Sequence, residues 1–329
     1  MGKPISGMLL EEGEIVKILV INAQGLITKN SKKKINYLEE LTKNEKVEMI
    51  NISETWYDME TGEDDKIEGY QVYRADRKNR PQGGTAIYRK DNIHGKIYEK
   101  FSNGECELIA VEFEYERSVN ITIYRPPNAK DFEVITEKIK IICEKYKHWT
   151  ILLTGDFNFP FVKWEEREGH RGCAYSYKSN MNVRISDKKQ FENLMNVMLD
   201  YNMQQINHWK TRNENTLDLV FVNEINYIKD LVVYDTGISD HRVIELSIKI
   251  LSDKLSKDHE IKEWKGYEMY NFYSDKINWK KVNEDLNINW DEILKDKNVK
   301  ESTKKFYQVL EEIVEKHIPK KKDKKQFDS

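Results

Sequence analysis

The chain has 329 residues, 39% of them hydrophobic, which is enough for one large α/β core with an appendage or for two modest domains. Its 54 basic and 57 acidic residues nearly cancel, so the chain as a whole is not a polycation that coats nucleic acid. Three widely spaced cysteines argue against a disulfide framework and a zinc cluster, and favour a reducing compartment. No apolar run has the length of a membrane span, and residues 1–14 lack the apolar core of a secretory signal. We therefore expect an intracellular protein with no membrane partner.

Between residues 15 and 250, short β-branched runs alternate with longer amphipathic segments. The expected strands are 15–21, 47–52, 70–74, 84–88, 107–113, 120–124, 150–153, 217–222, 231–234 and 243–248. The expected helices are 33–43, 131–147 and 188–201, and the last two each carry one apolar stripe. Because some strands are apolar on both faces and others alternate, we predict an α/β (α+β mixed) fold, a four-layered sandwich of two mixed β-sheets flanked by helices.

Three further segments are predicted outside this regular pattern. Residues 159–187 are polar and lack a clear period, so we expect a long surface loop there. Residues 1–14 are expected to be a flexible N-terminus. Residues 251–329 are expected to form a mostly helical, lysine-rich extension, with a helix at 300–317 that Pro319 ends. The lysine run that follows Pro319 is either a solvated end or a nucleic-acid contact or nuclear address.

Polar residues follow several of the expected strands. Asp156 and Asn158 come directly after an apolar run, and side chains two apart on a strand point to the same face. The same residues also suit an ordinary turn. Other polar residues at expected strand ends are Asn22, Glu54, Tyr124, Asp218, Asp240 and His241. Because the carboxyl ends of strands carry the chemistry of open α/β sheets, we expect these side chains to form one site.

This set of side chains has the inventory of metal-assisted phosphodiester hydrolysis. Glu54 could hold a hard cation, and Asp156 could orient or deprotonate water. Asp218 could fix the tautomer of His241 and favour its charged form. Taken singly, each residue also has a structural explanation: Glu54 as a turn cap, the Asp residues as turn or ion-pair residues, and His241 as a satisfied core histidine.

Taken in order, the motifs resemble those of the exonuclease/endonuclease/phosphatase superfamily over about residues 15–250. They are Asn22-Ala23-Gln24-Gly25-Leu26, Ser53-Glu54-Thr55-Trp56, Tyr124-Arg125-Pro126-Pro127, Gly155-Asp156-Phe157-Asn158, Leu217-Asp218-Leu219-Val220-Phe221 and Ser239-Asp240-His241. Four details of these motifs resemble the apurinic-type endonuclease domain of non-LTR retrotransposons. They are Glu54-Thr55-Trp56, Arg125-Pro126-Pro127, Trp164, and Thr211-Arg212 ahead of the Asp218 motif. Two departures are Gln24, where relatives often carry Asn, Asp or Arg, and Lys210, where many carry Pro.

The resemblance implies two sheets flanked by helices, a Mg²⁺ or Mn²⁺ ion, and cleavage of one strand of double-stranded DNA that leaves a 3′-hydroxyl. In such elements the nick primes reverse transcription at the target. By this resemblance Glu54 is the principal metal ligand, with Asn22 and Asp240 near the ion. Asp156 orients or activates water, and Asp218 pairs with His241. Asn158 and Tyr124 contact the scissile phosphate.

The resemblance also sets expectations for partners. No reverse-transcriptase Asp-Asp motif follows, so a reverse transcriptase module and the element RNA would be supplied elsewhere. Residues 267–325 resemble the connector that precedes the polymerase in such elements, and the expected location is nuclear. Candidate DNA contacts are Arg125, Arg212, Lys163 and Arg167, although each is equally an ordinary surface charge.

Alternative functions remain open from the sequence. One is an abasic-site repair endonuclease, and another is a phosphatase or sphingomyelinase of the same superfamily. A third, from a different class, is an inactive nucleic-acid-binding module.

Overall fold

The computed structural model consists of two compact units, residues 1–258 and 259–329. It describes residues 14–26, 32–45, 47–57, 66–77, 82–167, 170–179, 182–250, 270, 277–295 and 299–320. Residues 1–13, most of the predicted flexible N-terminus, and the lysine run from 321 onward lie outside this set.

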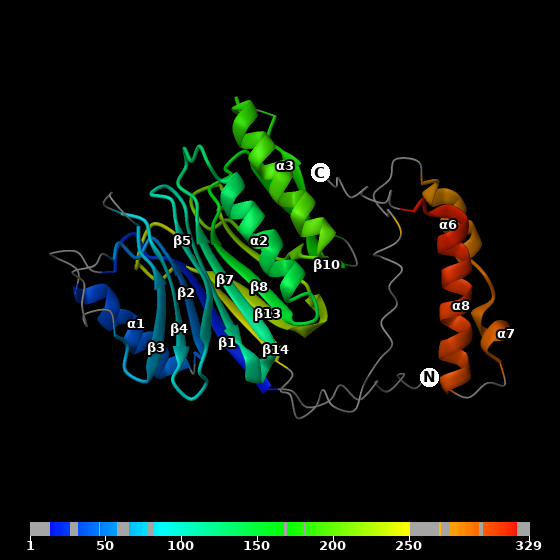
Figure 1. The fold of residues 1–329 in the computed structure, drawn as a ribbon, viewed down its shortest axis with the longest axis horizontal. Helices are drawn as coiled ribbons and strands as arrows, with labels where there is room; N and C mark the ends of the chain where they lie inside the picture. The colour runs from blue at the N-terminus through cyan, green and yellow to red at the C-terminus, as the bar shows by residue number, and fades with distance from the viewer. Residues whose placement is uncertain are drawn as a thin grey trace, which may run out of the picture. The chain divides into compact units, whose positions relative to one another are not determined.

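Two six-stranded mixed sheets form the body of the first unit (Figure 1). The strand order of the first sheet is β13 (Ile228–Tyr234), β14 (Val243–Ile250), β1 (Glu14–Asn22), β2 (Met49–Ser53), β4 (Thr85–Lys90) and β3 (Tyr70–Ala75). The strand order of the second sheet is β11 (Gln204–Gln205), β12 (Asp218–Val222), β8 (Thr150–Asp156), β7 (Ser118–Tyr124), β6 (Glu107–Phe113) and β5 (Lys96–Ser102). The β1/β2 and β7/β8 pairs are parallel and the other pairs are antiparallel.

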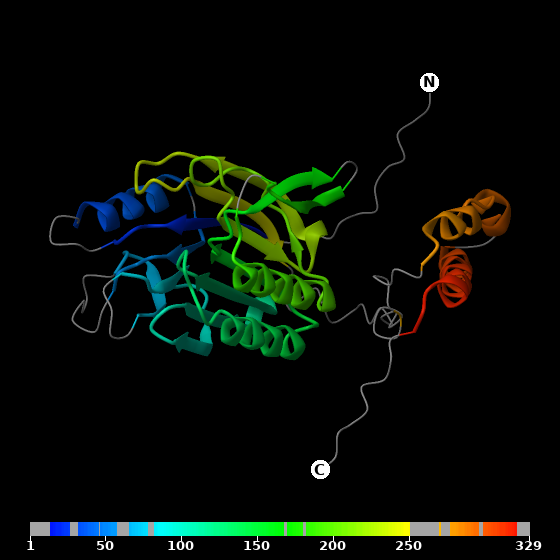
Figure 2. The same cartoon turned by 90° about the horizontal axis from the view of Figure 1, so that it is seen from above.

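Three helices cover the outer faces of the two sheets. Helices α2 (Glu133–Lys145) and α3 (Ile185–Asp200) lie side by side over the second sheet (Figures 1 and 2) and share a core with it. Helix α1 (Lys32–Glu45) packs against the first sheet. A further apolar core, which includes Ile18 and Leu152, fills the space between the sheets. The predicted four-layered α/β sandwich is confirmed.

The prediction of a long surface loop at 159–187 is wrong. Strands β9 (Val162–Arg167) and β10 (His170–Tyr177) form an antiparallel pair in this segment. The short strand β9 alternates buried Val162 and Trp164 with exposed charged residues, a period of two that the many charges obscured. Strand β5 was also not predicted, because this edge strand buries none of its residues fully and carries little apolar alternation.

The second unit is helical where the structure describes it. Helices α6 (Trp279–Leu286) and α7 (Trp290–Leu294) precede α8 (Val299–His317), which matches the helix predicted at 300–317. Asn278 and Asn289 begin α6 and α7 as side-chain caps. The small core of this unit contains Tyr270, Ile277, Val282, Ile313 and Ile318. Among the described residues, no helix has the length and apolar character needed to cross a membrane.

Candidate active site

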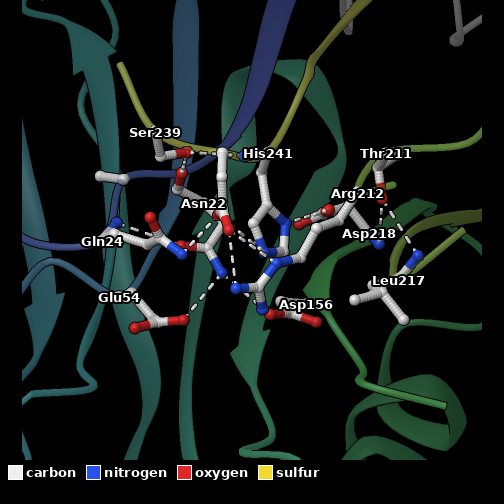
Figure 3. Close-up of polar contacts among 12 residues, drawn as sticks. Asn22, Gln24, Glu54, Asp156, Thr211, Arg212, Leu217, Asp218, Ser239 and His241 are labelled. Atoms are coloured by element: carbon white, nitrogen blue, oxygen red, sulfur yellow. Dashed lines mark hydrogen bonds and ion pairs between the residues drawn. The ribbon is translucent and has the colours of Figure 1, made fainter. Parts of the chain in front are cut away.

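Five of the predicted site residues gather at one edge of the two sheets (Figure 3), namely Asn22, Glu54, Asp156, Asp218 and His241. Strand pairing aligns Tyr124, Asp156 and Asp218 on neighbouring strands of the second sheet. In the first sheet Asn22 ends β1 beside Ser53, and Glu54 follows directly. Because the β1/β2 and β7/β8 pairs are parallel, the carboxyl ends of these strands lie at one edge of each sheet.

Asn22 joins the two sheets at this edge. Its side-chain amide nitrogen donates to Glu54 Oε1 at 2.9 Å and to Asp156 Oδ2 at 2.9 Å. Its amide oxygen accepts from the backbone N–H of Gln24 at 3.1 Å. One neutral side chain therefore fixes the spacing of two carboxylates that belong to different sheets.

Glu54 lies on a constrained turn after β2. Its φ is +54° and that of Trp56 is +58°, a conformation uncommon for residues with side chains. The indole Nε1–H of Trp56 donates to Glu54 Oε2 at 3.2 Å, which leaves the half-buried carboxylate held on both oxygens. Backbone bonds from Gly25 and Leu26 to the carbonyls of Glu54 and Thr55 fasten this turn to the end of β1.

Asp156 is fully buried at the end of β8. Its carboxylate accepts from the side-chain amide of Asn158 at 2.8 Å and from the Asn158 backbone N–H at 3.0 Å. Burial, reinforced by the nearby carboxylates of Asp218 and Glu54, raises the pKa of Asp156, while His241 and the Asn22 amide oppose this shift. A carboxylate with a raised pKa is a suitable proton acceptor near neutral pH.

Asp218 and His241 form a buried pair. The His241 Nδ1 lies 2.7 Å from Asp218 Oδ2, and the His241 backbone N–H donates to Ser239 Oγ at 3.1 Å. Burial opposes protonation, but the carboxylates of Asp218 and Asp156 outweigh it and raise the pKa of His241 to about 9. Among the described residues His241 Nε2 has no hydrogen-bond partner although it is buried, so it is a donor available to a substrate.

Tyr124 ends β7 and is almost wholly buried. Burial, with the carboxylates of Glu54 and Asp156 nearby, raises the pKa of its phenol, and a cationic Arg77 partly opposes this. The phenol therefore keeps its proton and can act as a hydrogen-bond donor.

Asp240 lies at the exposed rim of the site. Its Oδ1 accepts from Gln24 Nε2 at 2.5 Å, and its Oδ2 accepts two bonds from Arg212 at 2.7 and 2.9 Å. Asp240 Oδ1 lies 3.9 Å from His241 Nε2. Gln24, a departure from the usual motif, is thus linked directly to a predicted metal ligand.

The donor set fits a hard divalent cation. Carboxylate oxygens of Glu54 and Asp240 are the ligands that Mg²⁺ and Mn²⁺ prefer. A second group, Asp156, Asp218 and His241, has potential ligand atoms within 4.8 Å of one another. The Nδ1 of this histidine is paired with Asp218, and the raised pKa of His241 favours a protonated ring that cannot coordinate a metal, so this group suits proton transfer better than metal binding.

The four predicted DNA contacts differ in their surroundings. Arg125 is fully buried, and its guanidinium donates to Asn158 O at 2.9 Å and to Asp187 Oδ1 at 2.7 Å, so it secures the Asn158 loop. Lys163 and Arg167 are exposed on β9, where Lys163 pairs with Glu165. Arg212, through Asp240, is joined to the site itself.

Three residues near the site were not singled out from the sequence. Lys34 donates from Nζ to Ala23 O at 2.8 Å and to Gln24 O at 3.1 Å, and so secures the turn after β1. Arg77 and Glu107 form a buried ion pair beside Tyr124. A signal for Glu107 alone exists in the sequence, because it is a charged residue in a strand whose other inward positions, such as Ile109 and Val111, are apolar.

Comparisons with known proteins agree with this geometry. Residues 119–245 match the family model described as Endonuclease-reverse transcriptase. The endonuclease domain of TRAS1, a telomere-specific non-LTR retrotransposon, matches with a TM-score of 0.50 and 15% identity over 72% of this chain and 99% of its own. The AP endonuclease LMAP from Leishmania major matches with a TM-score of 0.50 and 12% identity over 71% of this chain and 88% of its own. No curated protein sequence is significantly similar to this chain. The predicted resemblance is confirmed, and at these identities the two structures show a shared fold.

Proposed function

We propose that this chain is a metal-dependent DNA endonuclease that nicks one strand of double-stranded DNA and leaves a 3′-hydroxyl for target-primed reverse transcription. The observation that carries the proposal is the Asn22 bridge between Glu54 and Asp156, next to the Asp218–His241 pair. The match of residues 119–245 to an endonuclease family supports a hydrolytic nuclease.

Glu54 and Asp240 would hold a Mg²⁺ or Mn²⁺ ion, and Asn22 would keep Glu54 in place. When bound, such an ion supplies Lewis-acid stabilisation of phosphate charge and lowers the pKa of water. Asp156, whose pKa is raised, would orient the attacking water and accept its proton.

The remaining residues would act on the phosphate. The Nε2–H of protonated His241 has no other hydrogen-bond partner among the described residues and would donate to a non-bridging oxygen. Tyr124 and Asn158 would position the phosphate through their hydroxyl and amide groups. Asp218 would keep His241 charged and oriented.

The proposed partners follow from this reaction. Arg212, Lys163 and Arg167 are the proposed DNA contacts, while buried Arg125 is assigned to the Asn158 loop instead. A reverse transcriptase module and element RNA would act on the nick, and we propose a nuclear location. These assignments rest on the predicted function and on charge.

Incubation of the purified chain with supercoiled plasmid, with and without Mg²⁺, tests the proposal. We expect relaxed circles only with the metal, and extension of the nick by a DNA polymerase would report the 3′-hydroxyl. Glu54→Ala, Asp156→Ala and His241→Ala should each lower the rate about 100-fold or more. Glu137→Ala, which removes an exposed carboxylate on α2, is the matched control and should nick normally.

Two results would contradict the proposal. Relaxation without metal, or full activity in the three site variants, would show that this site does not perform the reaction. Cleavage restricted to an oligonucleotide with an abasic site would instead assign the chain to repair-type chemistry.

A further inference from the structure

Arg77 and Glu107 form a buried ion pair beside the proposed active site. Arg77 Nε lies 2.8 Å from Glu107 Oε1, and its Nη2 lies 2.9 Å from Glu107 Oε2. The Arg77 side chain is 9% exposed and that of Glu107 is 0% exposed. Arg77 also donates to the carbonyl of Glu105. A bidentate pair with this burial holds the guanidinium in one orientation.

The Arg77 guanidinium faces the Tyr124 ring. Its Cζ lies 5.2 Å from the ring centroid, within the range of a cation–π interaction. Glu107 is also the strand partner of Tyr124 in the β6/β7 register. Arg77 therefore contacts the ring of Tyr124, the proposed phosphate-binding residue. Glu107 lies opposite Tyr124 on the neighbouring strand.

Two glycines support this arrangement. A Cβ on Gly83 would lie 2.3 Å from Arg77 Cζ, so any side chain at that position would displace the guanidinium. The backbone N–H of Gly84 donates to Glu107 Oε2 at 3.2 Å. The Gly83 and Gly84 carbonyls accept from Trp56 and Thr55, which places the ion pair next to the Glu54 turn.

We propose that Arg77, held by Glu107, is a positioning residue that orients the Tyr124 phenol toward the scissile phosphate. The inference rests on the proposed nuclease function. Arg77 is assigned to the tyrosine rather than to the substrate because its Nε and Nη2 donors are taken up by Glu107 and the Glu105 carbonyl and its side chain is only 9% exposed. Burying an ion pair is costly, and apolar residues of similar volume often stabilise a protein equally well. We therefore infer that the charge of Arg77 serves to orient the Tyr124 ring, because an apolar side chain at position 77 would not hold the ring in one orientation.

A double-mutant cycle on nicking rates tests this role. Arg77→Met should lower kcat about tenfold in the wild-type background, the scale of a partly desolvated cation–π contact. If Arg77 acts through the Tyr124 hydroxyl, Arg77→Met should cause no further loss of kcat in a Tyr124→Phe background. Arg77→Lys, which keeps the charge over the ring, should recover part of the activity. All rates are normalised to the folded fraction from thermal melts.

Arg89 provides a matched control in the same protein. It is also a buried arginine, with Nη2 2.5 Å from the buried carboxylate of Glu116 and its Cζ 5.9 Å from the Phe113 ring. Arg89 lies on β4 opposite Met49, at the other end of the strand from the site. Arg89→Met should lower the melting temperature and leave kcat of the folded protein unchanged.

The outcomes separate the two hypotheses. A wild-type chain that does not nick DNA with Mg²⁺ would overturn the proposed function. A wild-type chain that nicks, with additive effects of Arg77→Met and Tyr124→Phe, would overturn only the positioning role. An Arg77→Met variant that melts at a lower temperature but keeps the wild-type kcat would also overturn only the positioning role.

Discussion

The His241 imidazole combines burial, which disfavours its charge, with the carboxylates of Asp218 and Asp156, which favour it. Its folded-state pKa of about 9 lies above the ordinary value of 6.5. The resulting contribution to the free energy of unfolding is complete below pH 6.5 and is lost as pH rises through about 9. For this shift the contribution is on the order of 3 kcal/mol. Urea unfolding across this pH range should show the decline in the wild type, and Asp218→Asn should flatten it. The same pH slope in both proteins would contradict the assignment of the pair.

Most residues of the proposed site could be predicted from the sequence, because their side chains suit the same chemistry. Asn22, Glu54 and Asp156 lie at or just after the ends of strands and His241 lies just before one, and all are polar, so their positions and their resemblance to known motifs could be recognised. Arg77 could not be placed, because its partner Glu107 lies 30 positions along the chain and only the fold brings the two together. The burial of Arg125 was not predicted either, since a charged residue beside a motif looks the same in sequence whether it binds substrate or a loop.

Strand β8 shows how one element sets the site. Gly155 has a φ of +130°, and a Cβ at this position would lie 2.0 Å from Ile123 O on the neighbouring strand. Gly155→Ala should therefore cost more than about 3 kcal/mol of stability and displace Asp156, measured by chemical denaturation and by nicking. Gly69→Ala is the control, because Gly69 also has a positive φ of +78°, but a Cβ added there would have no neighbouring atom within 4 Å. It should cost about 1 kcal/mol and leave nicking intact. Equal losses in both variants would show that packing against Ile123 is unimportant.

Elements with a strong apolar pattern were predicted well, and those without one were not. Helix α2 was recognised from its stripe of Ile135, Ile139 and Ile142, all buried against the second sheet. Strands β5, β9 and β10 were missed because edge and surface strands bury only part of their side chains, so their period of two is weak. These three strands are defined by hydrogen bonding to a neighbouring strand, which the periodicity of the sequence does not reveal.

On the scale of the whole molecule, every residue of the proposed site lies in the first unit, residues 1–258. A chain that ends at residue 258 should therefore fold, and should nick plasmid DNA at the rate of the full chain. Thermal melts and the plasmid assay measure both properties. Loss of nicking in a shortened chain that melts normally would mean that residues 259–329 take part in the reaction or in DNA binding.

The division into two sheets could be predicted from composition and from strands apolar on both faces, but the order of strands could not. Sheet order depends on which strands pair across long separations, such as β12 with β8. That pairing sets Asp218 beside Asp156, and the sequence alone supports this contact only through the resemblance to known motifs.

The pairing of β1 with β14 joins the first strand of the unit to its last, with Glu14 opposite Ile250. During synthesis on the ribosome, His241 is the last of the proposed reactive groups to be made, and the pairing of the strand that follows it is complete only when Ile250 has been added. Under the proposed function, a growing polypeptide would therefore not cut DNA until this closing strand emerges. Under the same proposal, translation products that stop before Ile250 would lack the completed closing strand and would be inactive.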